Sequence, residues 1–114
     1  MEHTNTLGAL SDGMADAVEA VGPAVVRVNG RRRRSGTGVV YGPNTVLTAS
    51  HVLEREEDLT VGLRDGRTLP ARFAGRDHST NLAVLRVEGL DAGAATPAEG
   101  EARVGQLALA IGSP

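Results

Sequence analysis

The sequence predicts an all-β fold: a six-stranded antiparallel barrel with a short N-terminal helix and an extra C-terminal strand. Three observations support this prediction. The spacing of apolar residues changes from a helical period to an alternating one after Gly22-Pro23. Short runs rich in β-branched residues then follow one another, separated by glycine, proline and asparagine turn signals. Two neighbouring runs alternate so regularly that one face of each is apolar, which is typical of a small closed sheet with a filled interior.

The opening stretch predicts a short amphipathic helix that packs on the rest of the chain. Ser11 is the predicted N-cap and Asp12 lies in the predicted first turn. Apolar residues recur after them at helical spacing, at Met14, Ala17, Val18 and Val21. Gly22-Pro23 ends the helix, since the residue before a proline avoids the helical conformation.

Six strands are predicted, at residues 24–29, 35–41, 45–48, 59–63, 68–75 and 82–87. Gly42-Pro43-Asn44 suits a tight turn between the second and third strands, and Asp65-Gly66 is a hairpin signal between the fourth and fifth. On the fourth and fifth strands one face is apolar, and we assign to the barrel interior Leu59, Val61, Leu63, Leu69, Ala71 and Phe73. Pro70 must then avoid a position whose N–H the sheet needs.

After Val87 the chain loosens into an Ala-, Gly- and acid-rich stretch with Pro97, which predicts an exposed linker over 89–103. Residues 106–111 are strongly apolar and predict a seventh strand, which Gly112-Ser113-Pro114 ends. No later strand in the sequence is available to pair with it.

Composition limits the functions to consider. Twelve basic and fourteen acidic residues give a net charge of −2, so neither a nucleic acid nor a membrane surface is an expected partner. Without cysteine there is no thiolate and no cysteine zinc site, and His3, His51 and His78 lack metal-ligand spacing. We therefore expect no cofactor and no metal. The first residues have neither the basic nor the apolar region of an export signal, so the chain as written is expected to be unexported.

Four segments carry motifs, in one order along the chain: Ser35-Gly36-Thr37-Gly38-Val39-Val40, Thr48-Ala49-Ser50-His51-Val52, Asp77-His78-Ser79-Thr80-Asn81-Leu82-Ala83-Val84-Leu85, and Val104-Gly105 with Ala110-Ile111-Gly112-Ser113-Pro114. Together they resemble the trypsin-like serine proteases of the HtrA (Deg) type: the glycine-bearing second strand, the histidine motif, the aspartate motif and the segment that opens the second barrel. The resemblance covers about residues 17–114. It implies an N-terminal segment at 1–22, the N-terminal protease barrel at 23–88, a linker at 89–103, and the first strand of a missing second barrel at 104–114.

The resemblance implies that His51 is the catalytic general base, because a serine hydroxyl is a weak nucleophile until an imidazole removes its proton. Asn81 occupies the position at which these proteases carry the triad aspartate. If its amide NH₂ donates to Nδ1, the imidazole proton is forced onto Nε2 and His51 can no longer accept the serine proton. The alternative for Asn81 is a residue that merely begins a strand, and Asp77 is interpreted as the cap of the preceding turn.

None of the serines lies in a G-N-S-G-G type loop: Ser11, Ser35, Ser50, Ser79 and Ser113. Ser50 adjoins His51, but neighbouring residues on an extended segment point to opposite sides. The family carries its serine on the second barrel. The leading hypothesis is therefore the N-terminal half of an HtrA-like serine endopeptidase, inactive alone, which acts in complete form on unfolded protein or peptide. The compartment stays open, because such proteases are often periplasmic or secreted.

Two alternatives come from other classes of protein. A non-catalytic protease-like module would use the unpaired strand at 106–111 to form a homodimer. The run Arg31-Arg32-Arg33-Arg34 is interpreted first as a solvated loop and second as a contact for phosphate or acidic partners. It lacks interleaved aromatic residues, which argues against a nucleic-acid platform.

Overall fold

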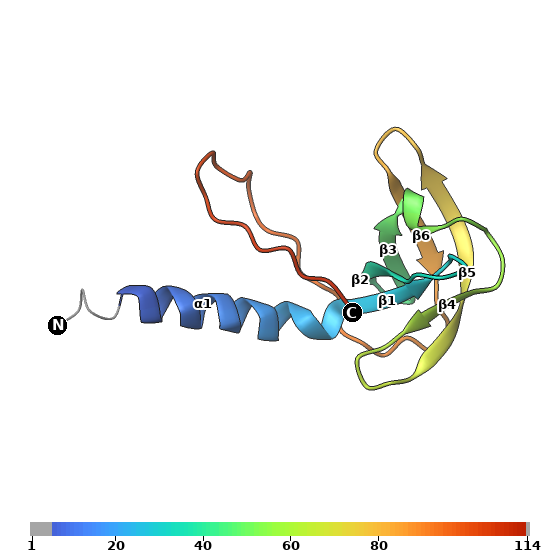
Figure 1. Ribbon diagram of the computed structural model, residues 1–114, viewed down its shortest axis with the longest axis horizontal. Helices are drawn as coiled ribbons and strands as arrows, with labels where there is room; N and C mark the ends of the chain where they lie inside the picture. Colours follow the sequence, from blue (N-terminus) through green and yellow to red (C-terminus); the bar gives the residue numbers. More distant parts are fainter. Residues whose placement is uncertain (1–5, 114) are drawn as a thin grey trace.

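Six strands follow one helix in the computed structural model, which describes residues 6–113 (Figure 1). The interpretations placed on 1–5 and on Pro114, including that of His3, lie outside these residues. All six predicted strands are confirmed, with ends that shift by two residues at most. The elements are α1 Thr6–Val21, the 3₁₀ turn η2 Gly22–Ala24, β1 Val25–Asn29, β2 Gly36–Gly42, β3 Thr45–Ala49, the 3₁₀ turn η3 Ser50–Val52, β4 Leu59–Gly62, β5 Thr68–Asp77 and β6 Leu82–Arg86.

The strands close into a barrel in the order β1-β2-β3-β6-β5-β4, and every neighbouring pair is antiparallel. Pairing of Val28 with Val61 closes the barrel between β1 and β4. Irregularities interrupt the register of β2 between Val40 and Gly42 and of β5 between Phe73 and Gly75. Such bulges bend a strand and change the face on which later residues lie.

The barrel interior is aliphatic, as a chain with two aromatic residues requires. The apolar face predicted on β4 and β5 is confirmed: the three β4-side residues are buried and the three β5 residues pack against the same core. Each fully buried valine or leucine contributes about 1.5–3 kcal/mol to folding. Gly38 admits this packing, because a Cβ there would lie 2.8 Å from a methyl carbon of Val28 and of Val46.

Pro70 lies in the part of β5 that pairs with β4 alone. It is opposite Thr60, whereas the ladder between β5 and β6 begins at Arg72. The missing N–H of Pro70 therefore leaves no gap in the β5–β6 ladder.

The helix differs from its prediction at its start and in its packing. It begins at Thr6, so Ser11 and Asp12 lie inside it and cap nothing. None of its residues is buried, and it projects away from the barrel (Figure 1). Its apolar stripe is exposed, from Leu7 at 79% to Val18 at 38%, so the prediction of a packing helix was wrong. No helix within residues 6–113 has the length and apolar character that a membrane span needs.

Residues 87–113 form no helix and no strand, so the predicted strand at 106–111 was also wrong. An apolar segment becomes a strand only when a neighbouring edge supplies hydrogen bonds, and all six strands of the closed barrel already pair on both sides. Residues 87–113 instead form an extended loop that passes near α1 and returns to the barrel (Figure 1). Two isolated contacts fix it to β2: Ala95 N–H to the Val40 carbonyl at 2.8 Å, and Ser113 N–H to Thr37 Oγ1 at 3.0 Å.

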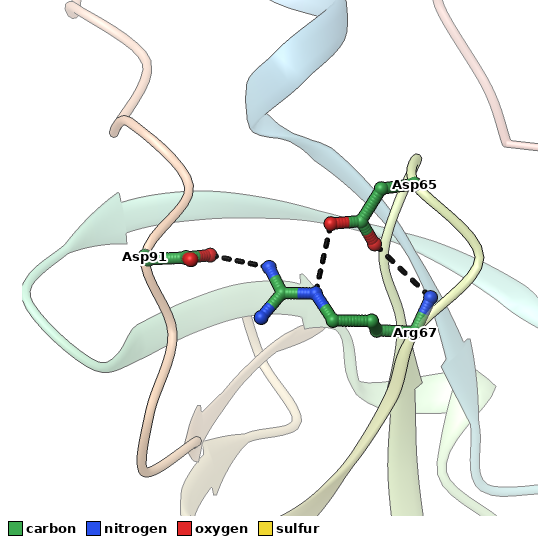
Figure 2. Close-up of polar contacts among 3 residues, drawn as sticks. All are labelled: Asp65, Arg67 and Asp91. Atoms are coloured by element: carbon green, nitrogen blue, oxygen red, sulfur yellow. Dashed lines mark hydrogen bonds and ion pairs between the residues drawn. The ribbon is translucent and has the colours of Figure 1, made fainter.

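One ionic contact also holds the predicted linker against the barrel. Arg67, in the turn before β5, donates through Nε to Asp65 at 2.8 Å and through Nη2 to Asp91 (Figure 2). The contact joins the β4–β5 turn to the segment after β6. Much of 89–103 is exposed, as expected, but it is attached at this point rather than free.

Candidate active site

His51 lies in the 3₁₀ turn η3, which follows β3 directly. Two backbone hydrogen bonds define the turn: Ser50 N–H to the Asn81 carbonyl at 2.8 Å, and Leu53 N–H to the Ser50 carbonyl at 3.1 Å. Ser50 and Val52 on either side are buried, whereas His51 is exposed. The backbone of the turn is therefore anchored while the imidazole faces outward, as the sequence predicts for a base at the edge of the barrel.

Asn81 lies beside His51 and contacts it through both ends of its side chain. Asn81 Oδ1 accepts the backbone N–H of His51 at 3.1 Å, and Asn81 Nδ2 lies 2.9 Å from His51 Nδ1. The two residues meet because β3 and β6 pair up to Ala49 and Leu82, the neighbours of the two turns. Asn81 has a φ of +59°, a left-handed conformation that asparagine tolerates better than most residues. The structure thus brings together the two residues predicted for the site.

The backbone N–H of His51 fixes which way the amide of Asn81 points. That N–H can only donate, so it requires the amide oxygen, and the NH₂ group is left facing Nδ1. An NH₂ group donates, so Nδ1 must be the unprotonated nitrogen. The neutral imidazole therefore carries its proton on Nε2. An aspartate at position 81 would accept from both groups and select the opposite tautomer.

Asp77 caps the turn that leads to Asn81, as predicted. Its Oδ1 accepts the hydroxyl of Ser79 at 2.7 Å and the backbone N–H of Ser79 at 3.0 Å. The Ser79 hydroxyl, followed by the Ser79 backbone N–H, lowers the pKa of the Asp77 carboxyl below its ordinary value. These side-chain contacts lie within its own turn, so Asp77 holds the loop rather than the imidazole.

Arg76 also holds the histidine turn, and sequence reasoning missed it. Its Nη1 donates to the Ser50 carbonyl at 3.4 Å, to Ser50 Oγ at 3.3 Å and to the Leu53 carbonyl at 3.3 Å. Its Nε lies 3.4 Å from a carboxylate oxygen of Glu56, and its guanidinium lies over the ring of Phe73. The guanidinium therefore bridges β5 and both sides of His51. The Ser50 hydroxyl oxygen accepts one of these hydrogen bonds.

The bulge in β5 explains why a charged residue points inward here. Strict alternation from Phe73 would place Arg76 on the opposite face. The shift between Phe73 and Gly75 instead pairs Phe73 with Leu85 and Arg76 with Ala83, and both of these β6 residues are buried. Arg76 thus shares the face of Phe73. Only the glycine at position 75 gave a sequence signal for this irregularity.

Within residues 6–113, no three histidine, aspartate or glutamate side chains are grouped so that they could hold a metal ion. In that range, the hydrogen bonds of the His51 ring go to Asn81 alone. The arrangement thus presents one oriented imidazole, with an amide behind it.

A family comparison agrees with this geometry: the trypsin-like peptidase domain matches residues 36–114, more than half of the chain. The chain belongs to the trypsin-like serine peptidases. Its relatives are of the HtrA type. A probable periplasmic serine endoprotease, DegP-like, of Halomonas elongata is 38% identical over 85 residues, which is 73% of this chain and 18% of that protein. The serine endoprotease DegS of Escherichia coli K12 is 32% identical over 112 residues, which is 86% of this chain and 32% of that protein.

Solved protease structures share the barrel. The serine endoprotease of Yersinia pestis matches with a TM-score of 0.61 and 35% identity, and the match covers 67% of this chain and 29% of that chain. The inactive form of the Rv3671c protease matches with a TM-score of 0.67 and 30% identity, and the match covers 75% of this chain and 43% of that chain. The chain thus spans between about a fifth and two fifths of the proteins it matches. The trypsin-like barrel predicted from the motifs is confirmed.

Proposed function

We propose that this barrel supplies the general-base histidine, His51, and its orienting partner, Asn81, to the catalytic centre of an HtrA-type serine endopeptidase that cleaves unfolded protein or peptide. The observation that carries the proposal is the pair of contacts between Asn81 and His51 at 3.1 and 2.9 Å. In such a centre the orienting residue accepts the Nδ1 proton, and Nε2 removes the proton of a serine. That serine and the oxyanion-hole donors would come from a second barrel.

Asn81 lowers the activity that this centre can reach. With its NH₂ group on Nδ1, the imidazole carries its proton on Nε2, the nitrogen that must be free. In the well-studied triad of the same fold, replacing the aspartate by asparagine lowers turnover by about 10⁴ for this reason. That factor corresponds to about 5.5 kcal/mol of activation free energy. The barrel alone should not hydrolyse peptide bonds.

The tautomer is measurable on this chain without catalysis. Nitrogen chemical shifts of the His51 ring should show Nε2 protonated and Nδ1 unprotonated in the neutral imidazole. Asn81→Asp should reverse the two, because a carboxylate accepts from Nδ1. His78, which is exposed outside this contact, is the internal control. Identical His51 tautomers in the parent and in Asn81→Asp would contradict the assigned contact.

The catalytic role is tested in a version that carries the second barrel. Asn81→Asp should raise casein hydrolysis by about two to four orders of magnitude. His51→Ala in the Asn81→Asp background should abolish the gain, which separates triad chemistry from a contaminating protease. An unchanged rate in Asn81→Asp, with the His51 tautomer reversed, would remove the general-base role while keeping the contact.

The second candidate is a homodimer through residues 106–111. Leu107 is 78% exposed and Leu109 42% exposed, and the segment has no ladder partner within the described chain. Leu109→Pro should abolish a dimer seen by sedimentation while leaving the barrel folded, because no strand of the barrel includes this residue.

A further inference from the structure

The loop between β1 and β2 carries four consecutive arginines, Arg31 to Arg34, next to the turn that holds His51. We call residues 31–34 the arginine loop. Both of its ends pack against the residues after His51. A Cβ at Gly30 would lie 2.7 Å from a methyl carbon of Leu53, and one at Gly36 would lie 2.5 Å from a methyl carbon of Val52. The Gly30 carbonyl also accepts the N–H of Glu54 at 3.0 Å. The loop is therefore fixed beside the histidine turn.

The charges of the arginine loop are largely uncompensated. The arginines that form ion pairs in residues 6–113 are Arg67, Arg72 and Arg76, none of them in the loop. Arg32, Arg33 and Arg34 are exposed. Arg31 folds back to donate to the Ser35 carbonyl at 3.3 Å, and its Nε is buried without a hydrogen-bond partner. In a chain of net charge −2, this loop is a concentrated positive patch.

Two shallow hollows flank the arginine loop. One, of about 410 Å³, is lined by the loop with Arg27, Asn29 and Ser35. The other, of about 370 Å³, is lined by the loop and Glu54. Glu54 is the one carboxylate that lines either hollow, so it is the group that a bound anion must displace or avoid.

We propose that the arginine loop binds carboxylate side chains of an unfolded polypeptide, and so directs acidic segments of substrate past His51. The interpretation of that polypeptide as substrate rests on the proposed function. Guanidinium groups match carboxylates in geometry and form charge-assisted, often paired, hydrogen bonds. A mobile peptide can meet several of these groups at once. Screening limits the attraction to groups within about 8–10 Å of the loop, so the loop acts on the substrate residues that pass directly beside it.

The surroundings favour a polypeptide over a nucleic acid. Binding of single strands combines a positive groove with aromatic side chains on which bases stack. The two aromatic residues of the chain, Tyr41 and Phe73, line neither hollow. Carboxylates need no stacking partner, and an arginine fork suffices for them.

The test uses the barrel itself and measures binding rather than hydrolysis. Fluorescence anisotropy compares two labelled unfolded peptides of one length, one rich in Asp and Glu and the other with Asn and Gln in their place. The acidic peptide should bind at least about tenfold more tightly at low salt, with an affinity that falls as salt rises. The triple variant Arg32→Ser, Arg33→Ser, Arg34→Ser should lose that preference, whereas Glu54→Gln should increase it about two- to threefold.

A second triple variant, Arg72→Ser, Arg86→Ser, Arg103→Ser, changes the net charge equally but leaves the loop intact. All three residues are exposed outside the hollows, so acidic-peptide affinity should stay within about twofold of the parent. Equal losses in both triple variants would overturn the proposal, since overall charge would then explain binding. A single-stranded oligonucleotide of equal charge that outcompetes the acidic peptide would also overturn it. Circular dichroism confirms that each variant is folded.

Failure of the proposed function gives a different pattern. An inactive two-barrel Asn81→Asp variant would refute catalysis by His51 without changing peptide binding. Loss of the acidic preference in an active variant would instead refute the arginine loop as a substrate contact.

Discussion

Two arginines stand at opposite ends of β5 and show two ways of tying a loop to the barrel. Arg67, just before the strand, meets two carboxylates, one at 2.8 Å, but its side chain is 46% exposed. Arg76, near the end of the strand, contacts mainly neutral oxygens at 3.3–3.4 Å, and its side chain is 16% exposed. Water and salt screen the exposed contacts of Arg67. The contacts of Arg76 are largely buried, and removing them would leave buried polar groups without hydrogen-bond partners, which lowers stability. Burial of the arginine, rather than the charge of its partners, should therefore decide which of the two contributes more to the free energy of unfolding.

The largest effect is expected from Arg76→Met. This change keeps much of the apolar stem but removes the guanidinium, which lies over Phe73 and donates to both sides of His51, and it should lower the free energy of unfolding by about 2 kcal/mol. Urea denaturation measures it. Arg76→Lys should restore part of the loss, because an ammonium can reach one carbonyl but cannot bridge several.

Arg67→Met is the matched control for this comparison, with the same change in charge and chemistry at the exposed end of the strand. It should shift the urea midpoint by less than Arg76→Met does. Equal shifts, or a larger one for Arg67→Met, would break the argument that burial decides.

A smaller effect is expected at Asn81, at the same end of the barrel as Arg76. Asn81→Ala and Asn81→Gly both remove the side-chain contacts with His51. Alanine at this position is also destabilising because of the positive φ of +59°, which glycine adopts freely. Asn81→Gly should therefore be more stable than Asn81→Ala by about 1 kcal/mol, as measured by urea denaturation. Equal stabilities would show that the loop relaxes away from the left-handed conformation.

The contrast between these ends also shows what sequence can predict. The strands were predictable because alternation and turn residues are local signals, and the turn at Asp65-Gly66 is one of them. The inward position of Arg76 was not, because the β5 bulge reverses the alternation after Phe73. The predicted N-cap at Ser11 was wrong, since the helix extends back to Thr6 and includes Ala9 and Leu10, which favour the helical conformation.

Contacts between residues far apart in the sequence are the second feature that local sequence patterns do not predict. Residues 106–111 are strongly apolar, as a buried strand would be, but a strand also needs an edge to pair with, and apolar character does not report this. His51 and Asn81 are 30 residues apart, so no local pattern links them. Their contact was predicted from the motifs that they occupy. Their atom-level arrangement, with the amide oxygen held by a backbone N–H, required the structure.

The smallest effects are expected on the pH dependence of stability. They concern Asp65 and Asp77, which lie near the two ends of β5. The backbone N–H of Arg67 first, and then its guanidinium, lowers the pKa of Asp65 below its ordinary value of 3.8. Asp77 has a lowered pKa as well, but its causes are the hydroxyl and backbone N–H of Ser79, which carry no charge. A lowered folded pKa adds stability that is present above 3.8 and is lost as the pH falls through the folded value.

Asp65→Asn and Asp77→Asn should therefore each make the urea midpoint fall less steeply than in the parent as the pH drops below about 4. Salt separates the two ends. Added salt should reduce the difference between parent and Asp65→Asn, because part of that contact is ionic, and should leave the difference for Asp77→Asn nearly unchanged. Equal salt sensitivity at both positions would mean that the Arg67 guanidinium adds nothing to the contact, and that backbone hydrogen bonding alone holds both turns.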